Sequence, residues 1–589
     1  MRRRISRPRA ALAVALAAAL GCAHRPPPAR GGPEAAPAHV RLLTLNDLHG
    51  QLVPGKKVDG RAVGSAGVLG AWLESSRAGA PGRTLLVQAG DLVGASPPAS
   101  ALLQDEPTVS FVNLFANGSC RYAEPAGSTA SPPAYPAPVP EVEPRFAPWL
   151  DPACDVVGAV GNHEFDEGRG ELLRLLGGGN HPRGPFLESP WRGARYPTLG
   201  ANVVDRATGR PILPPFVVKR VDGVRVGFIG VVTREVPTLV TPAGIAGLDF
   251  LDEAEAVNRY VPVLERQGVK AIVVLLHQGG DEPPYPGPTR DGVTVEGEIV
   301  DLVARLDPEV DVVVAGHTHA FLNARLPTAS GKRALVVEAY SAGTAFGWID
   351  LEVDRASGEV LTSRAAVQTT WADEGPGTSP DRASAALQAA AEARVAPLVD
   401  RVVARAAVPF PRAADPSGES RLGDLVTDAQ RAAVAGAQIA FTNPGGLRAD
   451  LPAGPLSWGA LFAVQPFGNA LVAMTLSGDQ LLELLDGQWA GAEPRVLQVS
   501  GLTYAWSASA PAGKRVRDVR VGGAPLEASG RYRVVVNSFL ASGGDGFGIF
   551  AAGIDRATAG DDLGALVGYL GSLPQPVERR PGARIRTLP

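Results

Sequence analysis

The sequence predicts an α/β protein with a layered N-terminal domain and a second, mixed α+β domain. Three observations indicate this organisation. Short apolar runs alternate with helix-like stretches from Val40 to about Val367. The runs are rich in Val, Ile and Leu without strict polar alternation, which is typical of strands buried on both faces. A break at residues 371–380 precedes a second series of elements.

Size and charge set the first limits. The chain has 589 residues, and its 56 basic and 60 acidic residues give a net charge of −4. This length fits two large domains as well as it fits about four of ordinary size. The charge balance excludes a strongly basic footprint for a nucleic acid polymer, and it gives no electrostatic reason to expect membrane attraction.

The first residues have the composition of a targeting segment. Five arginines among the first nine residues precede an unbroken apolar run, Ala10–Leu20, which is too short to cross a bilayer as a helix. We therefore predict a signal peptide over residues 1–21. Gly21 and Cys22 resemble the lipobox of bacterial lipoproteins, although the two residues before Gly21 stand in the reverse of the usual order. Cleavage without lipid attachment is the alternative.

The export signal has consequences for the rest of the chain. Residues 22–38 are Pro-rich without periodicity and predict a flexible tether. No other run approaches ~18 apolar residues, so the expected location is the periplasm or cell envelope, with membrane contact only through lipid on Cys22. Export permits disulfides. Cys120 and Cys154 remain as an even pair around a Pro/Ser-rich insert, and we predict that they are bonded rather than two buried thiols.

The N-terminal domain is predicted over residues 39–370. Its expected strands are Val40–Leu45, Thr84–Gln88, Val156–Val160, Arg225–Val232, Ala271–Leu276 and Val310–Ala315. Helices are expected between them at Leu248–Gln267 and Glu298–Leu306.

A connector over residues 371–403 contains an Ala-rich helix, Asp381–Val403, and leads to the second domain over residues 404–589. There, helices are expected at Leu422–Ala435 and Gly478–Leu485, and strands at Gln438–Thr442 and Tyr532–Asn537.

Polar motifs follow five of the apolar runs: Asn46–Gly50, Gly90–Asp91, Gly161–Asp166, His277 and Gly316–His319. Ligands bind beyond the carboxyl ends of strands in open α/β sheets, so these motifs should converge on one rim. Each motif alone is weak, because a single histidine is usually structural and a Gly-Asp pair is usually a turn. Together they contain five of the six histidines outside the N-terminal tail. The sixth, His181, reads as a loop residue without a role.

In this order the motifs resemble those of the calcineurin-like metallophosphoesterases. Residues 44–50 and 161–166 are closer still to the bacterial 5′-nucleotidase/UDP-sugar hydrolase family. The resemblance implies a four-layer αββα N-terminal domain and two divalent metal ions, Zn, Mn, Mg or Co. It implies one ion on Asp47, His49 and His319, a second on Asn162, His277 and His317, and Asp91 as the bridge between them.

The resemblance also implies a hydrolytic mechanism in which water activated by two metals attacks phosphorus in line. His163 would be a catalytic histidine facing the phosphoryl group, and Asp166 would orient it. None of these motifs supplies an obvious nucleophile for a covalent phosphoenzyme.

Three segments of the second domain carry the substrate prediction: Asn443–Arg448, Gln465–Asn469 and Asn537–Phe547. Aromatic residues beside Gly-rich turns can stack on a base, although a phenylalanine is more often part of a core. The segments resemble the nucleotide-binding domain of the same family. That resemblance implies base stacking by Phe467 and Phe539, ribose binding by Asp545, a place near the base edge for Gly501, and contacts to base or phosphate from Asn443, Asn469 and Arg448.

Two positions depart from the family pattern. Gly418 stands where an arginine is frequent, and Pro444 stands where glycine is frequent. Arg421 or Arg412 could supply the missing charge. The connector helix would allow the domain closure that the family uses, and a rigid helix is the alternative.

The favoured function is an exported, lipid-anchored 5′-nucleotidase that could also cleave UDP-sugars. A 2′,3′-cyclic nucleotide phosphodiesterase/3′-nucleotidase shares the fold, and a further relative hydrolyses sulfur–sulfonate linkages. A non-catalytic nucleotide-binding surface lipoprotein would lack ligands or His163, yet all seven ligand positions and His163 are present. The sequence leaves the oligomeric state and the preferred base open.

Overall fold

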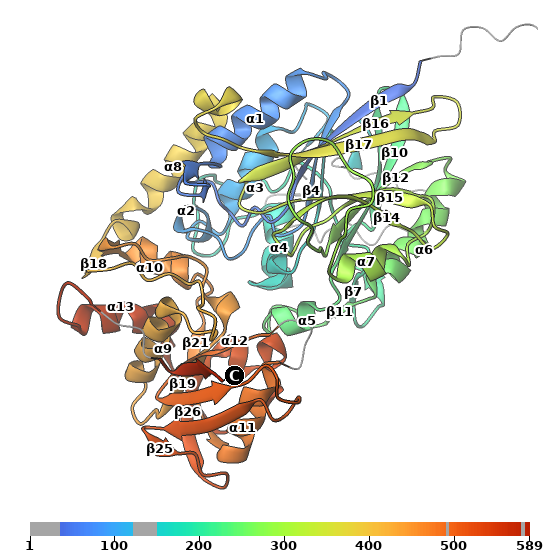
Figure 1. The fold of residues 1–589 in the computed structure, drawn as a ribbon. Coiled ribbons are helices and arrows are strands. Elements are labelled where there is room, and N and C mark those ends of the chain that lie inside the picture. Colours follow the sequence, from blue (N-terminus) through green and yellow to red (C-terminus); the bar gives the residue numbers. More distant parts are fainter. Residues whose placement is uncertain (1–35, 122–149, 490–493, 579–582, 589) are drawn as a thin grey trace, which may run out of the picture. The chain divides into compact units, whose positions relative to one another are not determined.

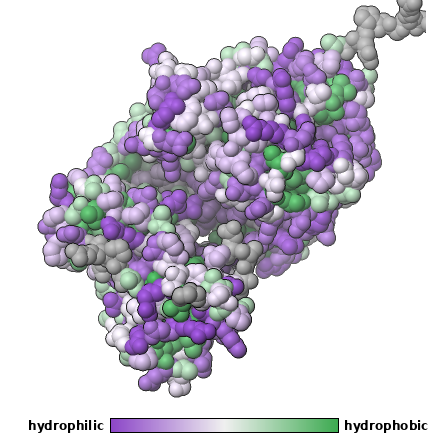
Figure 2. All heavy atoms as spheres, viewed as in Figure 1, coloured by the Kyte–Doolittle hydropathy of each residue, from purple (hydrophilic) through white to green (hydrophobic). Residues whose placement is uncertain are grey.

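The computed structural model describes residues 36–121, 150–489, 494–578 and 583–588. The predicted signal peptide, the lipid attachment at Cys22 and nearly all of the predicted tether lie outside these residues. Ala38, the last residue of that tether prediction, is the first residue of strand β1. Among the helices of the described ranges, none combines the length and the apolar character that a membrane span needs. Hydrophobic residues are scattered among hydrophilic ones on the face drawn in Figure 2.

Two six-stranded sheets form the frame of the N-terminal domain (Figure 1). The first has the order β17 (Val360–Thr369), β16 (Ala345–Val353), β1 (Ala38–Leu45), β4 (Thr84–Ala89), β5 (Val156–Ala159) and β6 (Thr198–Leu199). The second has the order β14 (Phe321–Pro327), β15 (Arg333–Ala339), β13 (Val310–Val314), β12 (Ala271–His277), β10 (Val224–Val232) and β9 (Phe216–Val221). The predicted strands are all present, and the central ones run parallel.

Successive side chains of these strands enter different layers. Leu42 belongs to the core between the two sheets, whereas Leu43 belongs to the core under the outer helices of the first sheet. Those helices are α1 (Ala66–Ala78), α3 (Glu106–Leu114) and α4 (Arg169–Gly177). On the second sheet, Ile272 packs with α6 (Glu253–Arg266) and α7 (Glu298–Val303). The four-layer αββα prediction is confirmed.

Two predicted helices include residues that form strands in the structure. The first three residues of the predicted helix Leu248–Gln267 form strand β11 (Leu248–Phe250), which pairs with β7 (Val203–Asp205). Helix α6 starts after Asp252, whose carboxylate caps the backbone N–H of Glu255. The connector helix α8 covers Arg382–Val399, and the chain then enters strand β18 (Val402–Ala406), because paired β-branched residues favour a strand there.

The C-terminal domain is built on a five-stranded sheet in the order β22 (Gln498–Ser500), β19 (Ile439–Thr442), β26 (Arg531–Asn537), β21 (Ala470–Ser477) and β27 (Ile554–Asp561). The helices are α9 (Arg421–Ala433), α10 (Trp458–Val464), α11 (Gly478–Gly487), α12 (Ser538–Ala541) and α13 (Asp562–Ser572). Strand β23 (Leu502–Trp506) pairs with β24 (Val516–Val521) and, in parallel, with β28 (Ile585–Thr587). The predicted mixed α+β character is therefore present.

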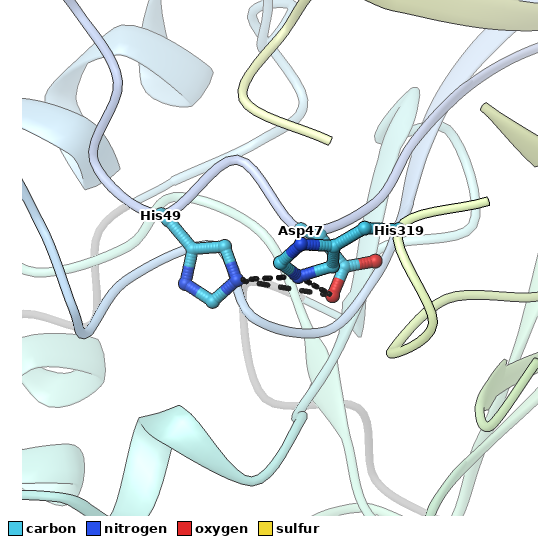
Figure 3. A group of neighbouring side chains, drawn as sticks. All are labelled: Asp47, His49 and His319. Carbon is cyan, nitrogen blue, oxygen red and sulfur yellow. Dashed lines mark hydrogen bonds and ion pairs between the residues drawn. The ribbon is translucent and has the colours of Figure 1, made fainter. Parts of the chain in front are cut away.

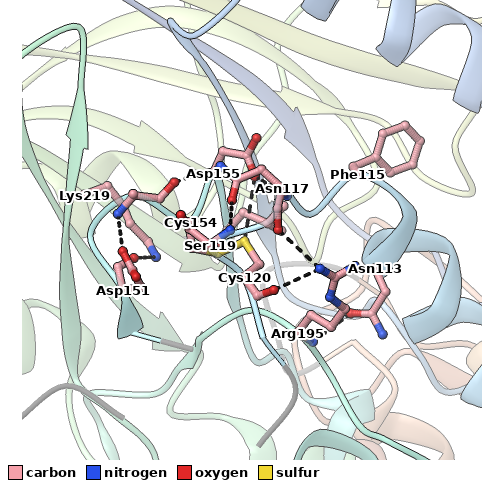
Figure 4. The surroundings of a disulfide bond; sticks show 12 residues. Asn113, Phe115, Asn117, Ser119, Cys120, Asp151, Cys154, Asp155, Arg195 and Lys219 are labelled. Carbon is pink, nitrogen blue, oxygen red and sulfur yellow. Dashed lines mark hydrogen bonds between the residues drawn. A yellow bond between two sulfur atoms is a disulfide. The ribbon is translucent and has the colours of Figure 1, made fainter. Parts of the chain in front are cut away.

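The predicted disulfide joins Cys120 and Cys154, and both cysteines are buried (Figure 4). Near it lies a fully buried lysine, Lys219 on β9, whose Nζ donates a hydrogen bond to the carbonyl of Asp151 at 3.0 Å. Burial lowers the pKa of Lys219 to about 7, although the charges of Asp151 and Asp155 oppose the shift. This part of the fold therefore holds a lysine whose side chain loses its proton near neutral pH.

Lys219 predicts a pH-dependent stability. An unfolded lysine titrates near ~10.4, so between about pH 7 and pH 10.5 the unfolded chain binds the extra proton and native stability falls as pH falls. We expect Lys219→Met to stabilise the protein at pH 6.5, with the gain shrinking towards zero near pH 10 at about 1.4 kcal/mol per pH unit. Urea unfolding across this range measures it, with exposed Lys57→Met as the control. If the stability gained by Lys219→Met did not change with pH, the lowered pKa of Lys219 would be contradicted.

Candidate active site

The polar motifs meet because the strands that carry them are neighbours. β1, β4 and β5 are adjacent in the first sheet, and β12 and β13 are adjacent in the second. Each motif follows the carboxyl end of its strand. The loops after the two sheets therefore bring together histidines and carboxylates that are far apart in the sequence.

The first group consists of Asp47, His49 and His319 (Figure 3). The Nε2 atoms of His49 and His319 are 3.0 Å apart, and His319 Nε2 is 3.3 Å from Asp47 Oδ1. Two ligands bound ~2.0–2.1 Å from one tetrahedral ion would lie about 3.3 Å apart. The spacing therefore fits a single shared cation.

The second group consists of Asp91, His277 and His317. His277 Nε2 lies 3.2 Å from Asp91 Oδ2 and 3.1 Å from the amide oxygen of Asn162. Asp91 Oδ2 also lies 3.7 Å from His49 Nε2 in the first group. The carboxylate that the sequence assigned as a bridge thus stands between the two groups.

Backbone carbonyls fix the orientation of two histidines. Nδ1 of His49 lies 2.9 Å from the carbonyl of Gly94, and Nδ1 of His277 lies 2.8 Å from the carbonyl of Ala89. Each Nδ1–H therefore donates to a carbonyl, which leaves Nε2 with a lone pair that points into the site. Both rings are held in the tautomer that a metal ligand needs.

The loops that carry the ligands are conformationally strained. Five of the seven predicted ligands have φ between 48° and 79°: Asp47, His49, Asp91, His317 and His319. Left-handed backbone at non-glycine residues costs about 1–3 kcal/mol each and persists only where the surroundings enforce it. The strained backbone lowers the stability of the fold at this site, and it orients the ligand side chains towards one another.

Charge and burial act in opposite directions on the site. Burial would raise the pKa of Asp47, but His319 and His277 hold it at about 2. Burial would lower the pKa of His277, but Asp91 raises it to about 10. A proton and a metal cation therefore compete for His277 Nε2. Burial lowers the pKa of His317 to about 4, which keeps that imidazole neutral and able to coordinate.

The predicted catalytic pair is also formed. His163 Nδ1 lies 2.7 Å from Asp166 Oδ2, and the backbone N–H of His163 donates to Asp91 Oδ1 at 2.9 Å. Burial would lower the pKa of His163, but the charges of Asp166 and Asp91 raise it. Its Nε2 is left to face the cavity as a proton donor.

Sequence reasoning gave no role to two buried carboxylates that hold the ligand loops. Glu164 accepts the backbone N–H groups of Asp91 at 3.0 Å, Leu92 at 2.8 Å and Gly161 at 2.5 Å. Glu338 on β15 accepts the Thr318 hydroxyl at 2.8 Å and so holds the turn between His317 and His319. The sequence offered one clue to Glu164, which is its place in the Gly-Asn-His-Glu motif. For Glu338 the only clue was that it is a charged residue within an apolar run.

A cavity of about 400 Å³ joins the ligand groups to the C-terminal domain. Its lining includes Asp91, His163 and His319 on one side and Arg448, Phe467 and Phe539 on the other. The rings of His163 and Phe467 stack at 5.8 Å with an angle of 16°, and Arg448 lies over Phe467 at 5.9 Å. Volumes of ~300–1,000 Å³ are usual for small-ligand sites.

The remaining predicted nucleotide contacts fall into two classes. Asn443, Asn469 and Asp545 line the cavity, and Asn443 Nδ2 donates to Asp545 at 2.7 Å. Gly501 does not line it. A Cβ there would lie 1.9 Å from the carbonyl of Gln438, and φ is +76°, so this turn requires a glycine.

The two departures from the family pattern have structural explanations. Pro444 begins a short 3₁₀ turn, Pro444–Gly446, where its missing N–H is harmless. Arg412 borders Gly418 in a separate cavity of about 240 Å³, and its charge acts on Lys56 and Arg448. Arg421 instead lies against the carbonyl of Pro409 at 3.4 Å. Arg412 is thus the arginine placed near Arg448.

Comparisons with known proteins match both parts of the chain. The family model for calcineurin-like phosphoesterases matches residues 40–321, and the model for the 5′-nucleotidase C-terminal domain matches residues 402–552. The solved 5′-nucleotidase precursor from Thermus thermophilus is 29% identical, with a TM-score of 0.72 over 93% of this chain and 99% of that one.

Two curated bacterial relatives are each 34% identical to the chain. Endonuclease YhcR of Bacillus subtilis aligns with 93% of this chain and 41% of its own length. Cell wall protein Lmo0130 of Listeria monocytogenes aligns with 87% of this chain and 64% of its own. The chain therefore spans less than two thirds of either relative.

Glu164→Gln should weaken metal binding. The amide would present an NH₂ group to backbone N–H donors that now share two carboxylate oxygens, and the Asp91 loop would shift. Loss of such supporting bonds typically costs 10–100-fold in metal affinity. Calorimetric titration with Mn²⁺ or Zn²⁺ measures the change, and Glu167→Gln, which bonds Gln104 instead of a ligand loop, is the control. Unchanged affinity would remove Glu164 from the site's support.

Proposed function

Because the chain belongs to the 5′-nucleotidase family of calcineurin-like phosphoesterases, we propose that it is a metal-dependent hydrolase that removes the 5′-phosphate of nucleotides. The observation that carries the proposal is the cavity shared by the metal-ligand groups and the aromatic residues. His163 stacks directly on Phe467 there. A base stacked in this cavity would place its 5′-phosphate within reach of His163.

The residues suit a dinuclear centre, with Asp47, His49 and His319 at one position, Asn162, His277 and His317 at the other, and Asp91 shared. Two divalent ions bound there would activate a water molecule and neutralise charge on the phosphate. Zn, Mn, Mg or Co would suit these oxygen and nitrogen ligands.

The protein's own residues would supply the remaining chemistry. His163, held by Asp166 through Nδ1, would donate a hydrogen bond or proton from Nε2 to the phosphoryl or leaving oxygen. Arg448 would pair with the phosphate, and Phe467 and Phe539 would hold the base. Asp545 would accept hydrogen bonds from ribose hydroxyls, and Asn443 would keep that carboxylate in place.

Phosphodiester cleavage is the second candidate, because the relative that aligns with 93% of this chain is named an endonuclease. The same metal chemistry would serve it, since both reactions attack phosphorus. The cavity volume of about 400 Å³ suits a mononucleotide. Cleavage of UDP-sugars would use the same residues.

We further propose that the protein is exported and anchored by lipid on Cys22. The proposal rests on the basic and apolar N-terminal sequence, on the Gly21–Cys22 pair and on the disulfide, which is typical of exported proteins. A relative is named a cell wall protein, which is consistent with the envelope.

A substrate panel tests the activity. With Mn²⁺ or Zn²⁺, we expect chelator-sensitive phosphate release from AMP, and His163→Ala should lower the rate by about 10²–10⁴-fold while metal stays bound. UDP-glucose, 2′,3′-cyclic AMP, an oligonucleotide and a small aryl phosphate are assayed in parallel. Hydrolysis of the oligonucleotide without AMP would favour the endonuclease alternative. Inactivity on every substrate with both metals bound would refute a phosphohydrolase.

Phe539→Ala separates nucleoside recognition from the chemistry. The ring of Phe539 packs on Gly544, which leaves its other face for a base. Stacking is worth about 1–3 kcal/mol, so KM for AMP should rise roughly 5- to 150-fold while aryl phosphate hydrolysis stays constant. Phe462→Ala, a half-buried ring beside Trp458 that does not line the cavity, is the matched control. Equal losses on both substrates would make Phe539 a core residue.

A further inference from the structure

A second polar cavity lies far from the active site and is bordered by arginines. It has a volume of about 430 Å³ and is lined by Arg220, Arg225 and Arg355, together with backbone and Ser357 from neighbouring turns. The turns are those between β9 and β10, after α6, and between β16 and β17. The proposed hydrolytic reaction uses none of these residues.

The arginines differ in how their charge is compensated. Arg355 pairs with Asp222 at 2.8 Å. Within the described ranges, no carboxylate lies at ion-pair distance from the exposed side chains of Arg220 and Arg225. Asp354, on a bordering turn, is bonded to Ser357. Arg225 donates to the carbonyl of Gly268 at 3.3 Å, but neither guanidinium charge is paired with a carboxylate of the described residues.

Strand topology places this cavity at the end of the sheets opposite the metal ligands. Ala38, which begins β1, is paired with Val353, and Asp47 follows the other end of the same strand. The backbone N–H of His39 donates to Asp222, the partner of Arg355. Figure 1 shows the start of β1 beside the β16–β17 turn. The arginine cavity therefore borders the point where the N-terminal segment enters the fold.

We propose that this cavity binds phosphate groups of anionic phospholipids and so orients the protein on the bilayer that holds its anchor. The proposal rests on the lipid anchor at Cys22 proposed above. Guanidinium groups bind phosphate oxygens in paired hydrogen bonds, and a juxtamembrane cation cluster adds to membrane affinity. The active site at the opposite ends of the strands then faces away from the membrane.

The length of the N-terminal segment permits this contact. Cys22 lies 14 residues before Ala36, where the described structure begins. A segment of fourteen residues spans at most about 50 Å. An anchored cysteine therefore keeps the cavity within reach of the headgroups without forcing contact.

Vesicle sedimentation tests the cavity separately from the anchor. Residues 37–589 form one compact unit, so the protein without residues 1–36 can be used. We expect it to sediment with phosphatidylglycerol-containing vesicles and not with phosphatidylcholine vesicles. Arg220→Gln/Arg225→Gln should reduce this partitioning about 25-fold, because each lost charge is worth about fivefold near an anionic surface. Raised salt should release the unaltered protein.

Controls keep the test decisive. Arg517→Gln/Arg531→Gln removes two exposed arginines of the C-terminal domain and should leave partitioning unchanged. Arg220→Gln alone should give a partial loss even if Arg225, which bonds the carbonyl of Gly268, were needed for folding. Equal binding by the cavity variant, or binding of inorganic phosphate but no vesicles, would overturn the proposal. AMP hydrolysis by all variants is assayed in parallel. A failure of the nucleotidase proposal would therefore be recognised separately from a failure of the membrane proposal.

Discussion

The Asp91 carboxylate is the group around which the site is arranged. It is buried together with Asp47, and two buried negative charges are costly unless cations compensate them. His277 and the backbone N–H of His163 contact Asp91 directly, and Glu164 holds the loop that carries it. The strained backbone of the ligand loops follows from the same requirement, because the side chains must converge on one small volume. A pair of divalent ions would neutralise the remaining negative charge of these two buried carboxylates.

The features that the sequence predicted were those marked by a local pattern or by the order of motifs along the chain. Apolar runs gave the central strands, and each predicted run lies within or beside an observed strand. The chain order of Asp47, Asp91, His277 and His317 gave the groups that the loops bring together, because parallel strands end on one rim. The disulfide followed from counting cysteines in a chain that the sequence predicts to be exported.

The features that sequence missed depend on contacts between distant residues. Nothing local distinguishes Glu338 from another strand residue, and its role comes from Thr318 on a facing loop. The steric reason for a glycine at position 501 was also hidden, because the carbonyl of Gln438, distant in the sequence, fills the space that a side chain would need. The residues of β11 look like the start of α6, since a three-residue strand exists only through pairing with β7. The sequence left Arg412 and Arg421 as alternatives for the extra charge, and only the structure shows that Arg412 is the one whose charge acts on Arg448.

The place of β1 in its sheet has a mechanical consequence. The strand pairs along seven positions with β16 and along five with β4, and its first residue receives any tension carried by the N-terminal segment. Force directed along the strand would load these hydrogen bonds in shear, so that many must break together instead of one after another. The same strand leads directly to Asp47. An attachment that pulled on the protein would thus load a strand that is paired on both sides before it could disturb the metal ligands.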